Sequence, residues 1–270
     1  MMPLRGGVAV ITGAASGIGA ALADVLAGRG CALALADLDA AGLREVAARA
    51  RAAGVAASEH QLDVADPEAV AALPDAVLAE HGRVSVLVNN AGVALGGRFE
   101  QVSPEDFDWL ISINFGGVVR MTRAFLPLLR REPAAQLVNL SSVFGIVAPP
   151  GQTAYAASKF AVRGFSEALR HELDGSTVGV TVVHPGGVRT AIAANARRAG
   201  LSNAETEAQA KAWAHFLRLD PRDAAERIAR GIERREKRVL VGRDAQQITL
   251  IQRMFPVEYW RLIQRSMRKA

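Results

Sequence analysis

Tyr155, Lys159 and the nearby Ser142 have the types and spacing that could move a proton. The tyrosine and the lysine stand four residues apart in the run YAASK. If a helix begins near Thr153, both fall on one face, one turn apart. An ammonium there favours the phenolate, so we expect the pKa of Tyr155 to lie below its reference value of about 10. A serine hydroxyl could hold the substrate oxygen, and the trio predicts general acid/base chemistry.

A glycine-rich loop lies between the first strand-like run and the first helical pattern. The run Val8–Thr12 continues as GAASGIG, with glycines at 13, 17 and 19. Such glycines permit a tight turn, close approach of a pyrophosphate and close helix–strand packing, and the helix N-terminus attracts the anion. Because the string lies inside a βαβ unit, we interpret it as a dinucleotide-binding loop rather than an ordinary turn. Its predicted cofactor contacts are Gly13, Ser16, Gly17, Ile18 and Gly19.

Asp37, at the end of the second strand, bears on the choice of cofactor. Its carboxylate could accept hydrogen bonds from the adenosine ribose, and it would repel a 2′-phosphate. No Arg or Lys stands at 14–16 or at the two positions after Asp37 to offset that repulsion. We therefore predict NAD rather than NADP. The alternative for Asp37 is stabilisation of the helix that starts near Asp39.

Further cofactor contacts are predicted at the ends of the next strands. Asp63 follows the third strand and could bind the adenine, although a cap on the helix beginning at Pro67 is nearly as good an explanation. The run NNAG at the end of the fourth strand combines amides with small residues, which suits a cofactor wall. The additional predicted contacts are Leu38, Asp63, Val64, Asn90, Ala91 and Gly92.

Short apolar runs alternate with helical patterns along the chain, which predicts a doubly wound, Rossmann-type parallel sheet with helices on both faces. Ligands bind such sheets at the carboxyl ends of the strands. Strands are predicted at Val8–Thr12, Ala32–Ala36, Ala56–Leu62, Val84–Asn89, Gln136–Ser141, Val178–His184 and Arg238–Val241. Helices are predicted at Gly17–Gly30, Ala40–Ala53, Pro67–His81, Pro104–Arg130, Ala154–Asp174 and Pro221–Lys237.

Composition excludes several classes of protein. The 270 residues include one cysteine, so no intramolecular disulfide can form, and no apolar run is long enough to span a bilayer. No secretory signal is recognised, and we expect a soluble cytoplasmic protein. The net charge of +5 is concentrated after residue 196, where we interpret it as solvated helix faces. Nucleic-acid binding rests on charge alone and is not predicted, and no His/Cys cluster has metal-ligand spacing.

With these motifs together, the sequence resembles the short-chain dehydrogenase/reductase family from about Val8 to Val241. The resemblance implies that Tyr155 is the acid/base and that Ser142 orients the substrate oxygen. It also implies that Lys159 holds the nicotinamide ribose and that Asn114 anchors a water on the proton path. The loop Pro185–Thr190 would border the nicotinamide through Pro185, Gly186, Val188 and Thr190. The motifs are Thr12–Gly19, Asp63, Asn89–Gly92, Asn114, Ser142, Tyr155, Lys159 and Pro185–Thr190.

The family resemblance also implies a lid over the substrate, at about residues 191–219. The apolar side chains of this lid, and those predicted to line the other side of the substrate pocket, suggest a lipophilic substrate. Equally, these side chains could serve only to pack the lid. His184, before Pro185, is interpreted as packed rather than catalytic. The predicted substrate contacts are Ser142, Phe144, Tyr155, Trp213 and Phe216.

We expect residues 1–242 to form one catalytic domain and residues 243–270 a basic amphipathic extension. The extension could lie on an anionic membrane, cover a substrate pocket or pack in an oligomer, and packing is favoured. The long patterns Pro104–Arg130 and Ala154–Asp174 resemble helices that join subunits in the family, which predicts a homodimer or homotetramer.

The function predicted is hydride transfer between NAD and a secondary alcohol or its ketone. An NAD-dependent dehydratase or epimerase is disfavoured, because only about 80 residues follow Thr190, too few for a larger substrate domain. A non-catalytic NAD-sensing protein is disfavoured because binding alone would not require Ser142, Tyr155 and Lys159.

Overall fold

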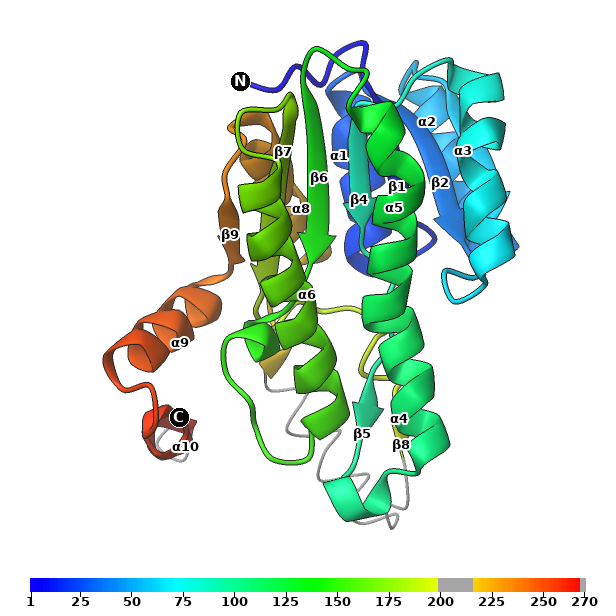
Figure 1. The fold of residues 1–270 in the computed structure, drawn as a ribbon. Coiled ribbons are helices and arrows are strands. Elements are labelled where there is room, and N and C mark those ends of the chain that lie inside the picture. The colour runs from blue at the N-terminus through cyan, green and yellow to red at the C-terminus, as the bar shows by residue number, and fades with distance from the viewer. Residues whose placement is uncertain (199–215, 268–270) are drawn as a thin grey trace.

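Seven parallel strands form the central sheet of this computed structural model, which describes residues 1–198 and 216–267. Their order is β3-β2-β1-β4-β6-β7-β9, so the strand order reverses between β1 and β4 (Figure 1). This confirms the predicted doubly wound sheet. The strands are β1 (Val8–Thr12), β2 (Ala32–Asp37), β3 (Ala57–Gln61), β4 (Val86–Asn89), β6 (Ala135–Leu140), β7 (Val178–Pro185) and β9 (Arg238–Val241).

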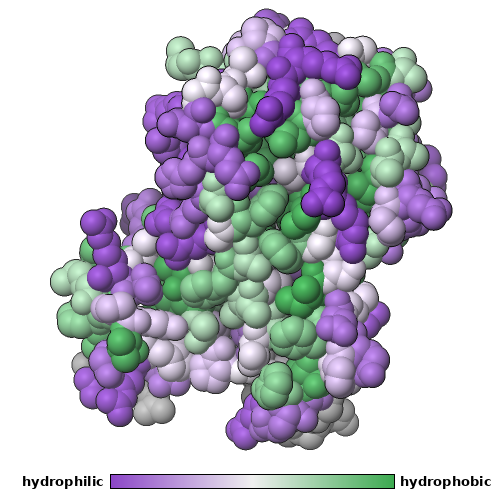
Figure 2. All heavy atoms as spheres, viewed as in Figure 1, coloured by the Kyte–Doolittle hydropathy of each residue, from purple (hydrophilic) through white to green (hydrophobic). Residues whose placement is uncertain are grey.

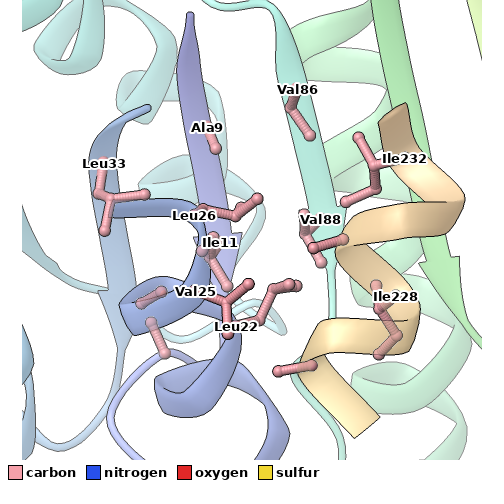
Figure 3. Close-up of a cluster of buried hydrophobic side chains, with 14 of the residues drawn as sticks. Ala9, Ile11, Leu22, Val25, Leu26, Leu33, Val86, Val88, Ile228 and Ile232 are labelled. Carbon is pink, nitrogen blue, oxygen red and sulfur yellow. The ribbon is translucent and has the colours of Figure 1, made fainter. Parts of the chain in front are cut away.

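Helices cover both faces of the sheet (Figure 1). Apolar side chains of α1, α2 and α8 pack against one face, and those of α3, α5 and α6 against the other. Figure 3 shows the first of these cores, where Leu22 and Leu26 of α1 and Ile228 of α8 meet the central strands. The helices on the two faces are α1 (Gly17–Gly28), α2 (Ala40–Ala52), α3 (Pro67–His81), α5 (Gly117–Leu129), α6 (Thr153–Glu172) and α8 (Pro221–Glu233).

Side-chain caps fix the starts of several helices. Asp39, Asp66 and Asp220 accept backbone N–H bonds at the N-termini of α2, α3 and α8. Prolines 67 and 221 occupy the first turn, where the missing N–H costs nothing. The cap of α3 is therefore Asp66, and the alternative explanation of Asp63 as that cap is wrong.

The predicted helix Pro104–Arg130 is interrupted by a wide turn. α4 (Pro104–Ile111) leads into a π-helical segment, η2 (Ser112–Gly116), before α5 begins. A π turn inserts one residue into the helical path and often marks a functional site. Here it carries Asn114 inward, where the side chain is fully buried. A 3.6-residue pattern does not reveal such an insertion.

Two short strands outside the main sheet tie the predicted lid to the body. β5 (Leu95–Gly96) pairs with β8 (Arg197–Arg198), which the sequence did not predict. Arg197 donates a hydrogen bond to Asp106 at 2.9 Å, and its guanidinium lies 3.5 Å from the Trp109 ring centroid. Arg197 is therefore engaged in the fold, with 51% of its side chain exposed. Most of the predicted lid, including Trp213, lies outside the described residues.

The chain after β9 forms two helices, α9 (Arg243–Met254) and α10 (Tyr259–Met267), which stand out from the sheet (Figure 1). Ile248, Ile251 and Trp260 pack on an apolar cluster around a 3-10 turn, η3 (Val143–Gly145). Part of the extension therefore packs on its own subunit. Leu250, Met254, Phe255 and Val257 remain exposed. In the described part of the chain, no helix has the length and apolarity needed to cross a membrane.

Candidate active site

The loops after β1 and β4 meet at the point where the strand order reverses. The Thr12 hydroxyl accepts the N–H groups of Asn90 and Ala91, each at 3.0 Å. In return, the Asn90 amide donates to the carbonyls of Thr12 and Gly13, both at 2.9 Å. Thr12 and Asn90 therefore hold the glycine-rich loop against the loop that carries Gly92.

The glycine-rich loop has the shape that a bound pyrophosphate requires. Gly13 and Gly17 adopt positive φ angles of 65° and 55°. A Cβ on Gly19 would lie 2.0 Å from the Gly13 carbonyl oxygen, so only glycine fits there. Ser16 makes no side-chain cap on α1, and the first turn of α1 contains no acid. The first N–H groups of α1 are thus available to an anion.

Asp37 is tied to this loop from the neighbouring strand. Its Oδ2 accepts the Ala15 N–H at 3.0 Å, and its Oδ1 accepts the N–H of Asp39 at 3.1 Å. Asp39 itself caps α2, so the predicted helix-stabilising alternative for Asp37 is at most a second role. One pocket gathers most predicted cofactor contacts: Gly13, Ser16, Gly17, Ile18, Asp37, Leu38, Asp63, Val64, Asn90, Ala91, Gly92 and Thr190. Gly19 does not line it, and acts through packing.

A second pocket adjoins the first and contains the candidate proton-transfer residues. Ser142, Tyr155 and Lys159 line it together with Pro185, Gly186 and Val188. Gly92, Asn90, Ile18 and Thr190 line both pockets, so the two are continuous. The structure thus brings the predicted catalytic trio to the end of the predicted cofactor site. Gln152, Leu95 and Leu217 also line this pocket. Leu217 falls within the predicted lid, whereas Gln152 and Leu95 were not predicted to contact a ligand.

The trio is held by two segments, α6 and the end of β6. Tyr155 and Lys159 lie in α6, as predicted, and the lysine Nζ is 5.7 Å from the tyrosine ring centroid. The ammonium also donates to the Leu140 carbonyl at 3.1 Å. Ser142 follows β6; its hydroxyl oxygen accepts the Phe144 N–H at 3.1 Å and makes a hydrogen bond with Tyr155. The hydroxyls of Ser142 and Tyr155 therefore lie next to each other in the second pocket.

Burial dominates the titration of this pair, contrary to the predicted lowering of the tyrosine pKa. Burial raises the pKa of Tyr155 to about 12, and the hydrogen bond with Ser142 only partly opposes it. Burial also lowers the pKa of Lys159 to about 8. Removing water penalises phenolate and ammonium alike, so proximity of the two groups does not by itself produce a phenolate.

Asn114 lies behind the trio rather than in the pocket lining. Its side chain accepts the Val93 N–H at 2.8 Å and donates to the Val93 carbonyl at 3.0 Å. A Cβ on Gly92 would approach the Asn114 Oδ1 to 3.2 Å and the Lys159 Nζ to 3.5 Å. The Gly92 backbone therefore lies close to both of these side chains.

The apolar wall of the second pocket joins distant segments. The Phe144 ring makes an edge contact with Tyr155, with centroids 6.2 Å apart. Phe216 stacks on Phe144 with centroids 6.3 Å apart and an interplanar angle of 16°. The predicted substrate contacts Phe144 and Phe216 therefore come together next to Tyr155. Trp213, the remaining predicted contact, lies outside the described residues.

His184 is buried beneath the trio, as the interpretation of a packed residue requires. Its ring nitrogen Nδ1 lies 2.8 Å from the Ser142 carbonyl oxygen, which must accept the proton. The other nitrogen, Nε2, is buried and has no hydrogen-bond partner among the described residues. Burial lowers the pKa of His184 to about 4, so the ring is neutral at pH 7.

Comparison with known proteins agrees with this geometry. The family model described as short chain dehydrogenase matches residues 7–200. The chain belongs to the short-chain dehydrogenase family. Like SadH, a provisionally named oxidoreductase of Mycobacterium tuberculosis, this short-chain dehydrogenase is an oxidoreductase; the two are 43% identical over 97% of this chain and 96% of SadH.

Solved short-chain dehydrogenase structures share the whole fold. One from Burkholderia phymatum, in complex with NAD, has a TM-score of 0.87 and 33% identity, over 94% of this chain and 95% of that one. A metagenomic relative in complex with NADP has a TM-score of 0.73 and 33% identity, over 88% and 98%. Among residues 1–198 and 216–267 of this short-chain dehydrogenase, no group of three or more His, Cys, Asp or Glu could hold a metal ion.

Proposed function

We propose that the protein transfers a hydride between NAD and a secondary alcohol or its ketone. The observation that carries this proposal is the convergence of Ser142, Tyr155 and Lys159 at the end of a pocket lined by the glycine-rich loop. The bound nicotinamide supplies the hydride acceptor or donor. The chain supplies orientation, proton transfer and exclusion of water.

Tyr155 is proposed to exchange the proton with the substrate oxygen. Because its pKa is about 12, the phenol is the resting form and is ready to protonate a ketone during reduction. In the oxidative direction the proton must leave Tyr155, and a Lys159 ammonium close to the ring favours that step. Ser142 is proposed to donate its hydroxyl hydrogen to the substrate oxygen, while one of its lone pairs accepts the Phe144 N–H. Asn114 is proposed to anchor a water that carries the proton onward from Lys159.

Residues of the first pocket are proposed to hold NAD. The N-terminus of α1, with Gly13, Ser16, Gly17 and Ile18, would hold the pyrophosphate. The carboxylate of Asp37 would accept the ribose hydroxyls and disfavour a 2′-phosphate. Leu38, Asp63 and Val64 would border the adenine. Relatives of similar identity bind NAD in one case and NADP in another, so Asp37 is the basis for choosing NAD.

A lipophilic substrate is proposed because the second pocket is walled by aromatic and aliphatic residues. Phe144 and Phe216 stack beside Tyr155, and Ile192 and Leu217 continue that wall. Burying apolar substrate surface there contributes about 25 cal/mol per Å². A dehydratase or epimerase and an NAD-sensing protein stay less favoured alternatives.

A homo-oligomer is proposed because apolar residues gather on one face of the surface. Figure 2 shows that apolar residues gather along the middle of one face, over α5 and α6. Phe160 of α6 is 39% exposed. An apolar helix face of this kind is typical of a surface that joins subunits. The exposed apolar residues of the extension could add to such an interface or contact a membrane surface.

The test is oxidation of a panel of secondary alcohols, sterols and polyols, with NADH formation followed by absorbance. Tyr155→Phe removes the titrating hydroxyl and keeps the ring. We expect a loss of activity of about 100- to 10,000-fold, while the Kd for NADH changes little. Retention of activity in Tyr155→Phe would contradict the role of Tyr155. NADH binding without turnover of any alcohol would favour the sensing alternative.

A further inference from the structure

An acid in the C-terminal extension contacts the loop at the cofactor pocket. Asp244 lies in the first turn of α9, and its Oδ2 accepts the N–H of Gly187 at 2.6 Å. The two residues are 57 positions apart in the sequence. A hydrogen bond from a backbone N–H to a carboxylate is charge-assisted, and contributes more than a neutral one.

The loop is shaped to receive this carboxylate. A Cβ on Gly186 would lie 2.2 and 2.3 Å from the two oxygens of Asp244. A Cβ on Gly187 would lie 2.0 Å from the Phe216 carbonyl oxygen. Both glycines are therefore required by close approach, one by the extension and the other by the chain entering α8.

The carbonyl group of Gly187, on the other side of this turn, is also held by hydrogen bonds. The Gly187 carbonyl accepts the N–H groups of Arg218 and Leu219, both at 2.9 Å. Gly187 is thus held through its N–H by Asp244 and through its carbonyl by the chain before α8. Removing Asp244 would leave the buried N–H of Gly187 without its partner, while the Gly186 N–H would still donate to the Val241 carbonyl at 2.9 Å.

The turn carries the residues that enter the pocket. Val188 donates to the Gly186 carbonyl at 3.0 Å, and both residues line the second pocket. Thr190 lies against Gly17 of the glycine-rich loop, where a Cβ on that glycine would meet its side chain at 3.1 Å. The Gly186–Gly187 turn therefore leads directly into residues that line both pockets.

The same extension also contacts the substrate side. Ile248 and Ile251 of α9 belong to the cluster that contains Phe144 and Phe216. The Tyr259 hydroxyl of α10 accepts the Ala148 N–H at 3.2 Å, on the loop that follows Ser142. The extension thus has attachments to both loops that border the site.

We propose that Asp244 is a positioning residue that holds the Gly186–Gly187 turn, which makes the C-terminal extension a working part of the site. The proposal rests on the proposed function, because it assigns the turn to the nicotinamide end of the pocket. The effect of Asp244 is indirect: it lines neither pocket, and it acts through Gly187, Val188 and Thr190.

The experiment compares Asp244→Ala, Asp244→Asn and a matched control in the full-length protein. Asp223→Ala is the control, because Asp223 is an exposed acid in the first turn of α8. Two quantities are measured: hydrogen–deuterium exchange of a peptide covering residues 183–191 without cofactor, and the Kd for NADH and NADPH. Asp244→Asn keeps the shape and an acceptor oxygen, and covers the case in which the alanine variant does not fold.

In Asp244→Ala we expect exchange around Gly187 to accelerate and the Kd for NADH to rise, each by about tenfold. Asp244→Asn should give a smaller rise of about threefold, and Asp223→Ala should change neither quantity. Values within twofold of the unmodified protein in both Asp244 variants, or equal changes in Asp223→Ala, would overturn the proposal. If the unmodified protein binds neither NADH nor NADPH, the proposed function fails, while the exchange result still decides whether Asp244 holds the turn.

Discussion

The two halves of the site are built by different kinds of contact. The nucleotide half, residues 8–92, is formed by loops that directly follow β1, β2 and β4, and backbone geometry dominates it. The substrate half, residues 93–198 and 216–267, is assembled from segments far apart in the chain. Phe144 meets Phe216 there, and Gly187 meets Asp244. The geometry of the nucleotide half depends on where the strands end, and the geometry of the substrate half depends on how distant elements pack together.

The difference affects how each half responds to substitution. In the nucleotide half, glycines are required because backbone approaches backbone. A methyl group added at such a glycine would collide with the neighbouring backbone. In the aromatic wall of the substrate half, side chains contact side chains, and these can yield by small movements. The Gly187 turn is an exception, because its backbone lies against the Phe216 carbonyl. We therefore expect abrupt losses in the first half and graded losses in the second.

The sharpest break is expected at Gly19. In Gly19→Ala the new Cβ would lie 2.0 Å from the Gly13 carbonyl, which forces the glycine-rich loop to move. We expect the Kd for NADH to rise by about 1,000-fold or more. The measurement is titration of NADH fluorescence, with circular dichroism to verify the fold.

Gly28→Ala is the matched control at the other end of α1. A Cβ at Gly28 meets nothing within 4 Å, and alanine is the better helix former. This variant should bind NADH normally and be as stable as the parent protein or slightly more so. Equal binding losses in Gly19→Ala and Gly28→Ala would show that the glycines act through helix propensity, and not through the loop.

The nucleotide half was largely predictable from the sequence for the same reason. Strand ends, glycine spacing and the acid at the end of β2 are local features of the sequence. At each of these places a single residue type determines the local backbone geometry. Seven strands were predicted within a few residues of their observed bounds. The cap of α3 shows the remaining uncertainty, because Asp63 and Asp66 stand close together and only the backbone turn selects Asp66.

The second prediction concerns His184, in the substrate half. Its pKa falls from 6.5 to about 4 in the fold, so the unfolded chain binds the proton more readily. The contribution of the neutral ring to stability is present above pH 6.5 and is lost as the pH falls towards 4. We expect a loss of about 3 kcal/mol over this range from this residue.

The measurement is urea unfolding from about pH 7 to about pH 4, in the parent protein and in His184→Asn. An asparagine amide can still donate to the Ser142 carbonyl and has no proton to gain. Its overall stability is expected to be lower because the side chain is smaller, but its pH slope should be shallower. Parallel curves for the two proteins would refute the assignment of the acid sensitivity to His184.

The substrate half was less predictable, because its important features have no local signal. The residues of the trio were found by type and spacing, yet the pKa of Tyr155 was predicted in the wrong direction. Spacing places Lys159 beside the ring, but it does not report how much water is removed from both. The π turn at Asn114, the wall residue Gln152 and the contact of Asp244 with Gly187 likewise depend on tertiary packing.

A third prediction tests the cofactor preference at Asp37. Asp37→Asn removes the charge and keeps an oxygen that can accept the Ala15 N–H. Because repulsion of a 2′-phosphate is lost, the ratio of kcat/KM for NAD to that for NADP should fall by about tenfold. The ratio is measured with one alcohol and both cofactors. An unchanged ratio would mean that Asp37 serves the loop alone.

The smallest effect is expected in the aromatic wall. Phe216→Leu keeps the residue apolar and removes the stacking on Phe144, so we expect KM for a lipophilic substrate to rise by about threefold. The Kd for NADH should stay unchanged, since the phenyl ring faces the substrate side. Phe99→Leu is the control, because Phe99 is 67% exposed and does not line the pocket. A parallel rise in the Kd for NADH would show that the aromatic wall, like the Gly186–Gly187 turn, also shapes the nucleotide half.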